Sequence, residues 1–386
     1  MSMWVKKSAN NAKYLLVNYT DDSNRGLIQF GGSDEFLFQS KYSNSNNAVL
    51  QTNRKFRDVS AWYNFVLIGD STLATAGDRL KLYVNGVRET SFASETQISQ
   101  NGNFYLNEAT TNGFRIGEKG DGSDFFDGYI SHFVFLDGVA AAYTEFGETD
   151  STSGIWKFKS PSGLTFGTNG VHLKFENSSN LGLDSSSNTN NMSVNGNLRQ
   201  ALDTPSNVYC TMNPLDNQNQ GSTFTIGNNK IEYNTNNKTN FATFAVNEGK
   251  WYWEMKFANN TGGNDAMIGV VKEIDRDGSD WVGHDAIGWS YYASNGSKYT
   301  GGSGSSYGNS WTTNDIIGIA FDADTRTLWF SKNGVWQNSA TISEIAAGTT
   351  TNSAFSGIGS AGEYFFPAMS GYDGNKVEFN FGNGYF

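Results

Sequence analysis

Acidic side chains at alternating positions are the most direct sign of chemistry in this sequence. Glu273, Asp275 and Asp277 are separated by single residues, so an extended strand would turn all three to one side. Two carboxyl groups held about 5 Å apart can act as acid and nucleophile on a glycosidic bond. The second Glu that would complete such a pair does not follow, and Gly278 indicates a turn. We therefore expect no active glycosidase at this segment.

The same carboxylates also match part of a calcium-binding loop. Calcium takes about six to eight oxygen ligands, and such a loop closes with an acidic residue that binds through both oxygens. His284 stands where that residue is expected, so Glu273, Asp275 and Asp277 form an incomplete ligand set. A similar acidic set lies in the first half of the chain: Asp121, Asp124 and Asp127. We expect solvated loops and no cofactor, with calcium as the ion that such loops could take.

Histidine and cysteine are sparse. His132 falls on the apolar face of an alternating run, which predicts a packed core side chain, whereas His172 falls on a polar strand face and His284 in a loop. No two of them have zinc-ligand spacing. Cys210 is the only cysteine, which excludes an internal disulfide and a Cys-rich zinc site. A Ser–His–Asp triad stays open, since its members can be distant in sequence.

Aromatic side chains in polar, Gly-rich segments are the remaining candidates for function. Trp281, Tyr299, Tyr307 and Trp311 lie in or beside such segments. Rings of this kind stack on sugars or anchor a protein partner, with nearby Asn and Asp supplying hydrogen bonds. Ordinary packing beneath a loop is the alternative for each of them. We predict these four residues as ligand-binding anchors.

Alternating apolar and polar residues indicate the elements that position these side chains. The clearest runs are residues 79–84, 171–176, 251–257 and 377–381, each with one apolar face. Asn85-Gly86 and Asn333-Gly334 stand between such runs and favour type I′ hairpin turns. Helical periodicity is confined to short stretches at 138–146 and 342–347. The pattern predicts an all-β chain of two tandem antiparallel, jelly-roll-like sandwiches.

Composition narrows the classes of partner. The 386 residues carry a formal net charge of −11 and no long basic run, so we expect no nucleic acid partner. No apolar stretch is long enough to span a membrane, and residues 1–7 lack the apolar region of a signal peptide. Aromatic residues make up 15% of the chain, which indicates packed cores rather than disorder.

The second half of the chain resembles the SPRY family. The similarity covers residues 221–386 and rests on an ordered series of segments: Gly249-Lys250-Trp251-Tyr252-Trp253-Glu254, Ile268-Gly269-Val270, Gly288-Trp289-Ser290-Tyr291, Ile317-Gly318-Ile319-Ala320-Phe321-Asp322, Thr327-Leu328-Trp329-Phe330, Tyr364-Phe365-Phe366-Pro367-Ala368 and Phe379-Asn380-Phe381-Gly382. The resemblance implies a sandwich that binds proteins or peptides through loops at one end.

The first half resembles laminin-G/concanavalin-A-like sandwiches, a group that commonly binds glycans. The segments that carry the resemblance are Ala61-Trp62-Tyr63, Leu82-Tyr83-Val84-Asn85-Gly86-Val87, Ile116-Gly117 and Phe126-Asp127-Gly128-Tyr129-Ile130. Such domains usually carry a strand before the segment equivalent to residues 2–8. We therefore expect an edge near these residues that is open, short or covered by another subunit.

Together these features predict a domain order and a function. We expect a sandwich at 1–178, an irregular connector at 179–220 and a SPRY-like sandwich at 221–386. With Asp203-Thr204-Pro205-Ser206-Asn207 and Met212-Asn213-Pro214-Leu215, the chain resembles structural proteins of marine bacteriophages.

The resemblance to phage proteins implies a non-enzymatic protein of the virion surface, either a tail fibre or a capsid-decorating component. It would act as an adhesin for a host receptor or glycan. A homo-oligomer, with a trimer favoured, or attachment to other virion proteins would close the open edge. The alternatives are a purely structural cement protein and a glycan-hydrolysing enzyme.

Overall fold

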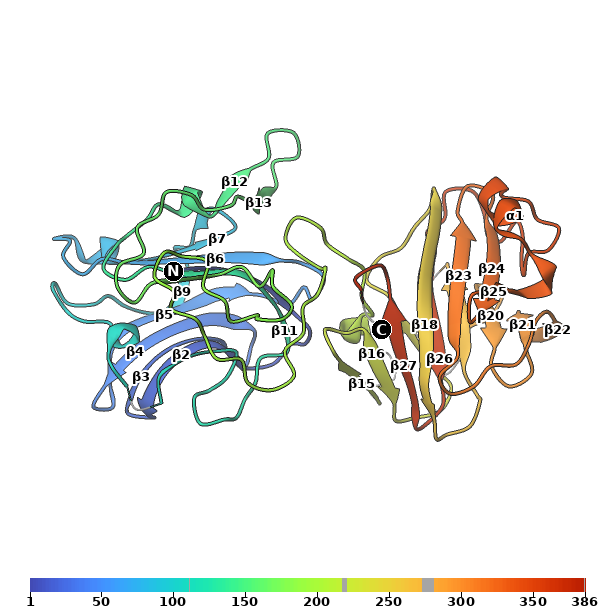
Figure 1. The fold of residues 1–386 in the computed structure, drawn as a ribbon, viewed down its shortest axis with the longest axis horizontal. Coiled ribbons are helices and arrows are strands. Elements are labelled where there is room, and N and C mark those ends of the chain that lie inside the picture. Colours follow the sequence, from blue (N-terminus) through green and yellow to red (C-terminus); the bar gives the residue numbers. More distant parts are fainter. Residues whose placement is uncertain (111, 217–220, 273–280, 385) are drawn as a thin grey trace. The chain divides into compact units, whose positions relative to one another are not determined.

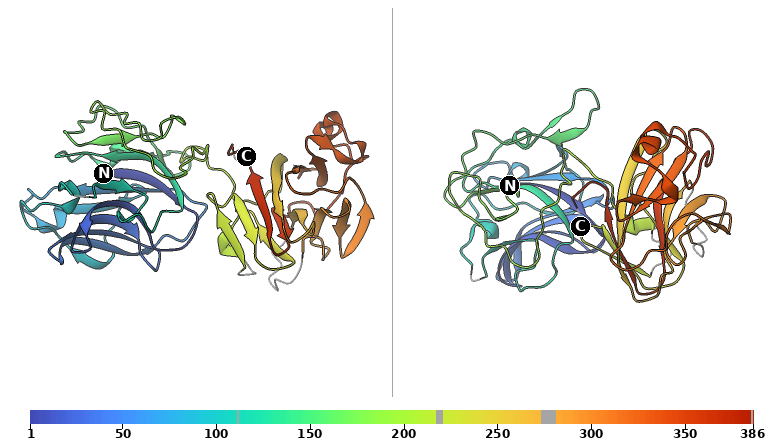
Figure 2. Two further views of the ribbon diagram at one scale, coloured as in Figure 1. Left: turned by 60° about the horizontal axis from the view of Figure 1, so that its bottom comes forward. Right: turned by 45° about the vertical axis from the view of Figure 1, so that its right-hand side comes forward.

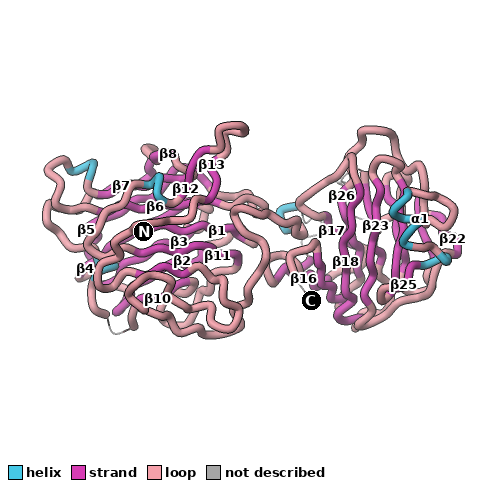
Figure 3. The backbone as a smooth tube through the Cα atoms, turned by 45° about the horizontal axis from the view of Figure 1, so that its top comes forward, coloured by secondary structure: helices cyan, strands magenta, loops and turns pink. Residues whose placement is uncertain are grey.

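The chain forms two compact units, Met1–Val208 and Tyr209–Phe386. The structure is a computed structural model and describes residues 1–110, 112–216, 221–272, 281–384 and 386. Strands joined by turns and loops dominate both units (Figure 3). The strands pair antiparallel, and in each unit two large sheets bury a shared apolar core within the described residues. The predicted fold class, all-β with two tandem antiparallel sandwiches, is confirmed.

The first unit packs a "β1 sheet" against a "β3 sheet". The β1 sheet has the order β14 (Val171–Leu173), β11 (Gly128–Phe135), β1 (Ser2–Lys7), β6 (Tyr63–Gly69), β7 (Leu80–Val84) and β8 (Val87–Arg88). The β3 sheet has the order β10 (Phe114–Ile116), β2 (Lys13–Asp21), β3 (Asn24–Phe30), β4 (Glu35–Tyr42), β5 (Ser45–Lys55) and β9 (Phe92–Thr96). Strands β2, β3 and β4 curve as one layer in every view (Figures 1 and 2).

Strand β1 is not an edge, contrary to the expectation from sequence. It pairs with β11 on one side and with β6 on the other, so its backbone groups on both sides are used. Alternation turns Met3 and Val5 into the core between the sheets, where neither is exposed. The strand therefore offers no open edge to another subunit.

The opposite face of the β1 sheet is covered by the chain that follows β11. Val66, Val134 and Leu136 pack there against Phe146 and Phe166. The cover includes β12 (Gly147–Thr149) and β13 (Trp156–Phe158), which pair with each other. It extends beyond β14 in mostly irregular structure, held by hydrogen bonds such as those from the Asn188 side chain to the Gly167 and Gly170 carbonyls.

A buried ion pair fastens this cover to the centre of the β1 sheet. Lys6 Nζ lies 2.7 Å from Asp203 Oδ2, and the side chains are 1% and 0% exposed. Trp62 Nε1 donates to the other carboxylate oxygen at 2.9 Å, and Lys6 Nζ lies 5.5 Å from the Tyr129 ring centroid. Residue 203 lies in the predicted connector, and this contact belongs to the first unit.

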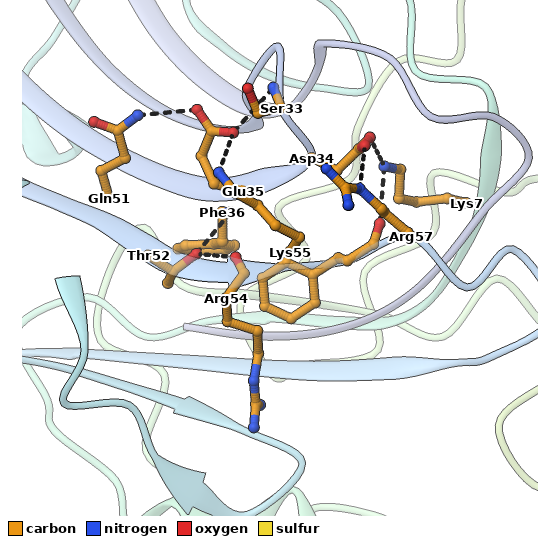
Figure 4. A network of polar contacts seen from close by, with 11 residues as sticks. Lys7, Ser33, Asp34, Glu35, Phe36, Gln51, Thr52, Arg54, Lys55 and Arg57 are labelled. Atoms are coloured by element: carbon orange, nitrogen blue, oxygen red, sulfur yellow. Dashed lines mark hydrogen bonds and ion pairs between the residues drawn. The ribbon is translucent and has the colours of Figure 1, made fainter. Parts of the chain in front are cut away.

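A second polar network holds the turn between β3 and β4 (Figure 4). Asp34 accepts from Lys7 Nζ at 2.7 Å and lies 3.4 Å from Arg57 Nε, while Lys7 also donates to the Phe56 carbonyl at 3.0 Å. Glu35 accepts from Gln51, from the Ser33 backbone N–H and from Lys55. Burial lowers the pKa of Lys7, and the adjoining Asp34 opposes that shift. The network is structural, since each carboxylate is already matched by cations or donors.

The second unit packs a "β18 sheet" against a "β19 sheet". The β18 sheet has the order β15 (Ser222–Thr225), β16 (Lys230–Tyr233), β27 (Asn375–Asn380), β18 (Lys250–Asn260), β23 (Ile316–Asp322), β24 (Thr327–Lys332) and β25 (Val335–Trp336). The β19 sheet has the order β17 (Lys238–Phe241), β26 (Phe366–Gly371), β19 (Met267–Val271), β20 (Gly288–Tyr292), β21 (Ser297–Thr300) and β22 (Ser303–Ser306).

Turns and helical segments follow local sequence closely. Asn85-Gly86 and Asn333-Gly334 adopt positive φ at both positions, as predicted for type I′ turns. Helix α1 (Ile342–Ala347) begins with a capping box between Thr341 and Glu344. Single 3-10 turns occur at η1 (Ala76–Asp78), η2 (Tyr105–Asn107), η3 (Tyr143–Glu145), η4 (Pro214–Asp216) and η5 (Gln337–Ser339). In the part of the chain that is described, no helix is long and apolar enough to cross a membrane.

Removing one member of the Lys6–Asp203 pair should destabilise the first unit strongly. Asp203→Asn leaves a buried ammonium without its anion, and we expect the free energy of unfolding to fall by about 3–5 kcal/mol. Urea denaturation of the full chain measures the change. The exposed pair of Lys157 and Glu148, 3.4 Å apart, supplies the control. Glu148→Gln should change stability by less than about 1 kcal/mol. Equal effects of both variants would contradict this account.

Candidate functional site

The four predicted aromatic anchors separate into a buried pair and a surface pair. Tyr307 is 7% exposed and Trp311 is 1% exposed, and both belong to the core between the sheets. Their ring centroids lie 5.7 and 6.1 Å from that of Tyr291. The structure thus corrects the prediction for Tyr307 and Trp311. Their Gly- and Ser-rich neighbours indicated a surface loop, but the chain turns back after β22 and inserts both rings beneath it.

Trp281 and Tyr299 come together on the outer face of the β19 sheet. Their ring centroids are 5.4 Å apart with an interplanar angle of 90°. His284 lies 5.4 Å from Trp281, and Tyr292 lies 5.6 Å from Tyr299. All four side chains are at least partly exposed. We call Trp281, His284, Tyr292 and Tyr299 the ring cluster.

Strand register places two of these rings. Tyr291 packs in the core, so its neighbour Tyr292 must face outward at the end of β20. Ser290 pairs with Tyr299, and Tyr299 pairs with Gly304, so these three positions also face outward across β20, β21 and β22. The alternation of residues 288–292 was the signal that could have identified Tyr292 from sequence.

The loop that carries Trp281 and His284 is anchored by its buried neighbour Val282. The Val282 N–H donates to Ser370 Oγ at 2.7 Å, and Ser290 Oγ donates to the Val282 carbonyl at 2.6 Å. The Val282 side chain joins a small apolar cluster with Phe241 and Val271 on the same outer face. Both hydrogen bonds reach central strands of the β19 sheet, so the sheet fixes the loop at the residue next to Trp281.

Two glycines allow the close approach of these segments. Gly283 has φ +95°, and a Cβ there would lie 2.7 Å from the Tyr299 carbonyl oxygen. Gly304 carries the Tyr299 ring directly over its Cα, where a Cβ would come within 2.5 Å of the ring. Tyr299 therefore rests on bare backbone, and a side chain at position 304 would displace it.

Carboxylates border the ring cluster. The Tyr292 hydroxyl donates to Asp265 Oδ1, and burial together with this bond raises the pKa of Tyr292 to about 12. His284 Nδ1 lies 3.4 Å from Asp285 Oδ1, and both side chains are nearly half exposed. The cluster thus combines apolar ring faces with carboxylate groups.

The predicted calcium candidates belong to two segments, of which one is described. Glu273, Asp275 and Asp277 lie outside the described residues. Asp121 accepts from Ser123 and lies 3.0 Å from Lys119 Nζ, whereas Asp124 lies 3.8 Å from Lys13 Nζ. Across the described ranges, no group of three or more His, Cys, Asp or Glu side chains could hold a metal.

Two histidines meet on the covered face of the β1 sheet. His172 is 4% exposed, which corrects its predicted place on a polar strand face. His132 lies 6.1 Å from it, stacks on Phe158 at 3.9 Å and has φ +47° where the pairing of β1 with β11 shifts register. Burial lowers the pKa of His132 to about 4, and burial also lowers that of His172. Both imidazoles are therefore neutral near pH 7.

A cavity in the first unit was not foreseen from sequence. It has a volume of about 410 Å³ at one end of the sandwich, with Phe38, Phe135 and Leu136 among its apolar lining. Three loops, around residues 69–72, 102–104 and 138–141, contribute to the wall. Loops this far apart in sequence show no common pattern, so only the assembled sandwich reveals the cavity.

Comparison with known proteins identifies a domain in each unit. Residues 1–144 match the model of the concanavalin A-like lectin/glucanases superfamily, and residues 250–384 match that of the SPRY domain. Among solved structures, the chain is similar to the SPRY domain of human HERC1, with 21% identity over 44% of this chain and 96% of that one and a TM-score of 0.32. No curated protein matches the chain. The predicted domain order, concanavalin A-like and then SPRY, is confirmed.

Substitution of the two tryptophans should separate core from surface. Trp311→Ala removes a fully buried ring, and we expect the second unit to lose about 3–5 kcal/mol of stability. Trp281→Ala removes a partly exposed ring, and we expect a loss of about 1 kcal/mol or less. Urea denaturation of the full-length variants measures both. A larger loss for Trp281→Ala than for Trp311→Ala would reverse the assignment of the two side chains.

The buried histidines should make the first unit acid-sensitive. Their folded-state pKa values lie below the unfolded value of about 6.5, so the unfolded chain binds more protons between that pH and about 4. Stability should decline as pH falls through this window, with a contribution on the order of 3 kcal/mol from His132.

Melting temperature against pH measures this decline. The double variant His132→Asn, His172→Phe should decline less, because Asn tolerates a positive φ and neither new side chain titrates in this range. His284→Gln, at an exposed position, is the control and should keep the original slope. An unchanged slope in the double variant would show that other groups cause the acid sensitivity.

Proposed function

We propose that this protein is a non-enzymatic adhesin of a virion surface, as a phage tail fibre or a capsid-decorating component. In this proposal the ring cluster of the SPRY domain contacts a receptor or glycan on the host cell. The observation that carries the proposal is the meeting of Trp281 and Tyr299, 5.4 Å apart and partly exposed, on the outer face of a rigid sheet. Aromatic rings held in this way are the usual anchors of binding surfaces.

The chemistry of the cluster supports recognition more than cement or hydrolysis. Rings with adjoining carboxylates offer stacking surface and hydrogen-bond acceptors, which suit a sugar or a peptide side chain. The two described carboxylates at the cluster already have partners: Asp265 accepts from the Tyr292 hydroxyl, and Asp285 lies against His284. The glycan-hydrolysing alternative depends on Glu273 and its neighbours, which lie outside the described residues.

Assembly remains a separate part of the proposal. A homo-oligomer, with a trimer favoured, or attachment to other virion proteins would suit an adhesin that binds its receptor at several points. Strand β1 no longer motivates this expectation, because it lies inside its sheet. Light scattering of the full chain measures the oligomeric state independently of any receptor.

Loss of either ring should weaken attachment without unfolding the domain. We expect Trp281→Ala and Tyr299→Leu each to lower binding to host cells or to a glycan array at least about tenfold. The melting temperature should change by less than about 4 °C. Trp251→Ala is the matched control, since Trp251 is 48% exposed on the β18 sheet and should be neutral for attachment.

Three other outcomes would oppose the adhesin proposal. Unchanged attachment in both ring variants would move the binding surface elsewhere, with the cavity of the first unit as the next place to test. Binding only to virion proteins, and to no glycan or cell, would favour the cement protein. Release of reducing sugar from a bound glycan would identify a hydrolase.

A further inference from the structure

The rings of the ring cluster stand at right angles to one another. Tyr299 lies at 90° to Trp281 and at 88° to Tyr292, with centroid separations of 5.4 and 5.6 Å. His284 lies at 83° to Trp281 on the loop. Tyr299 thus forms the middle wall of the cluster. The two rings beside it, Trp281 and Tyr292, are each nearly perpendicular to it.

This spacing is compatible with a cation held between two rings. A cation roughly 4 Å from the centres of two perpendicular rings sets those centres roughly 5.7 Å apart, within the range of cation–π attraction. The ring faces attract positive charge because of the electron density above them. The same separations also permit plain edge-to-face packing, so the charge around the rings must distinguish the two.

The surroundings of the rings are acidic. Asp265 lies against the Tyr292 hydroxyl, and Asp285 lies against His284. Among the described residues from 265 to 285, the only Lys or Arg is Lys272, which is paired with Glu363 at 3.3 Å. The two carboxylates beside the rings therefore favour a cationic ligand over a neutral or anionic one.

The opposite face of the same strand already holds a cation between rings. Lys298 precedes Tyr299 on β21 and therefore points to the other side of the sheet. Its Nζ lies 5.2 Å from the Phe355 ring and 5.9 Å from the Tyr307 ring, and it donates to the Ala354 carbonyl. An ammonium group is thus accommodated by two rings and a carbonyl on this sheet.

We propose that the ring cluster binds an organic cation, a quaternary ammonium or methylated amine group, between Trp281, Tyr292 and Tyr299. The inference rests on the proposed function and specifies the receptor group that this same site would recognise. Asp265 and Asp285 supply the countercharge. A methylated ammonium suits the site because its methyl groups contact the ring faces while its charge meets both the rings and the carboxylates.

A choline titration of the full-length protein tests the proposal. Choline chloride should shift the indole N–H resonance of Trp281 in a saturable way, and Trp281→Phe identifies that resonance by its loss. The neutral isostere 3,3-dimethylbutan-1-ol has the same shape without the charge and should give no saturable shift at equal concentration. Sodium chloride at matched ionic strength controls for screening.

Variants that remove or displace a ring of the cluster, or remove a carboxylate beside it, should weaken choline binding. Tyr299→Leu, which removes the middle wall, should raise the dissociation constant about tenfold, the loss expected for a cation–π contact of about 1.4 kcal/mol. Asp265→Asn should raise it severalfold by removing countercharge. Gly304→Ala should also raise it, because the new Cβ displaces the Tyr299 ring. Trp251→Ala should bind choline as the original chain does.

The outcomes separate this inference from the proposed function. Equal shifts with choline and its neutral isostere, or no shift with either, would overturn the cation site. If Trp281→Ala abolishes attachment while choline causes no shift, the adhesin proposal is supported and the cation site is contradicted. If choline binds but the ring variants attach normally, the cation site is supported and the ring cluster is not the surface that attaches to the host.

Discussion

Each large sheet in this protein buries one face in a core between two sheets, and its other face must be covered by other parts of the chain or remain exposed. Side chains alternate along a strand, so Met3 and Val5 enter the core of the first unit while Lys6 faces out. In the first unit that outer face is covered by the following chain, with Asp203 matching the Lys6 charge. In the second unit, Val282 covers a small part of the outer face and the ring cluster stands beside it.

Features that depend on neighbouring residues could be predicted from sequence. Alternation in residues 251–257 identified the core side chains Trp253 and Met255. Successive side chains of a strand point to opposite faces of the sheet, so alternate positions face the core. The Asn85-Gly86 and Asn333-Gly334 turns were predictable for a similar reason, since few residues adopt two positive φ angles in succession. Fold class follows from the sum of such local signals.

Features that depend on distant residues could not be predicted. Tyr307 and Trp311 have a loop-like local sequence, yet their burial is decided by Tyr291, Phe257 and Phe330, which reach them from other strands. The sequence pattern places His172 on a polar strand face, but in the structure the chain around Phe166 covers this side chain. Trp281 and Tyr299 were each identified as candidates. Their meeting depends on the strand register and on the Ser290 and Ser370 hydrogen bonds to Val282.

The position of β1 inside its sheet also determines when the first unit can fold. Val5 pairs with Ile130, so β1 has no partner on that side until some 125 residues have followed. At roughly 5–20 residues per second, translation of that interval takes roughly 6–25 s. During this time β6 can pair with the other side of β1, as Val5 does with Tyr63, whereas Lys6 waits longer still for residue 203. The nascent chain therefore passes through a prolonged stage in which one edge of an apolar strand is open to wrong pairing, before β11 can cover it.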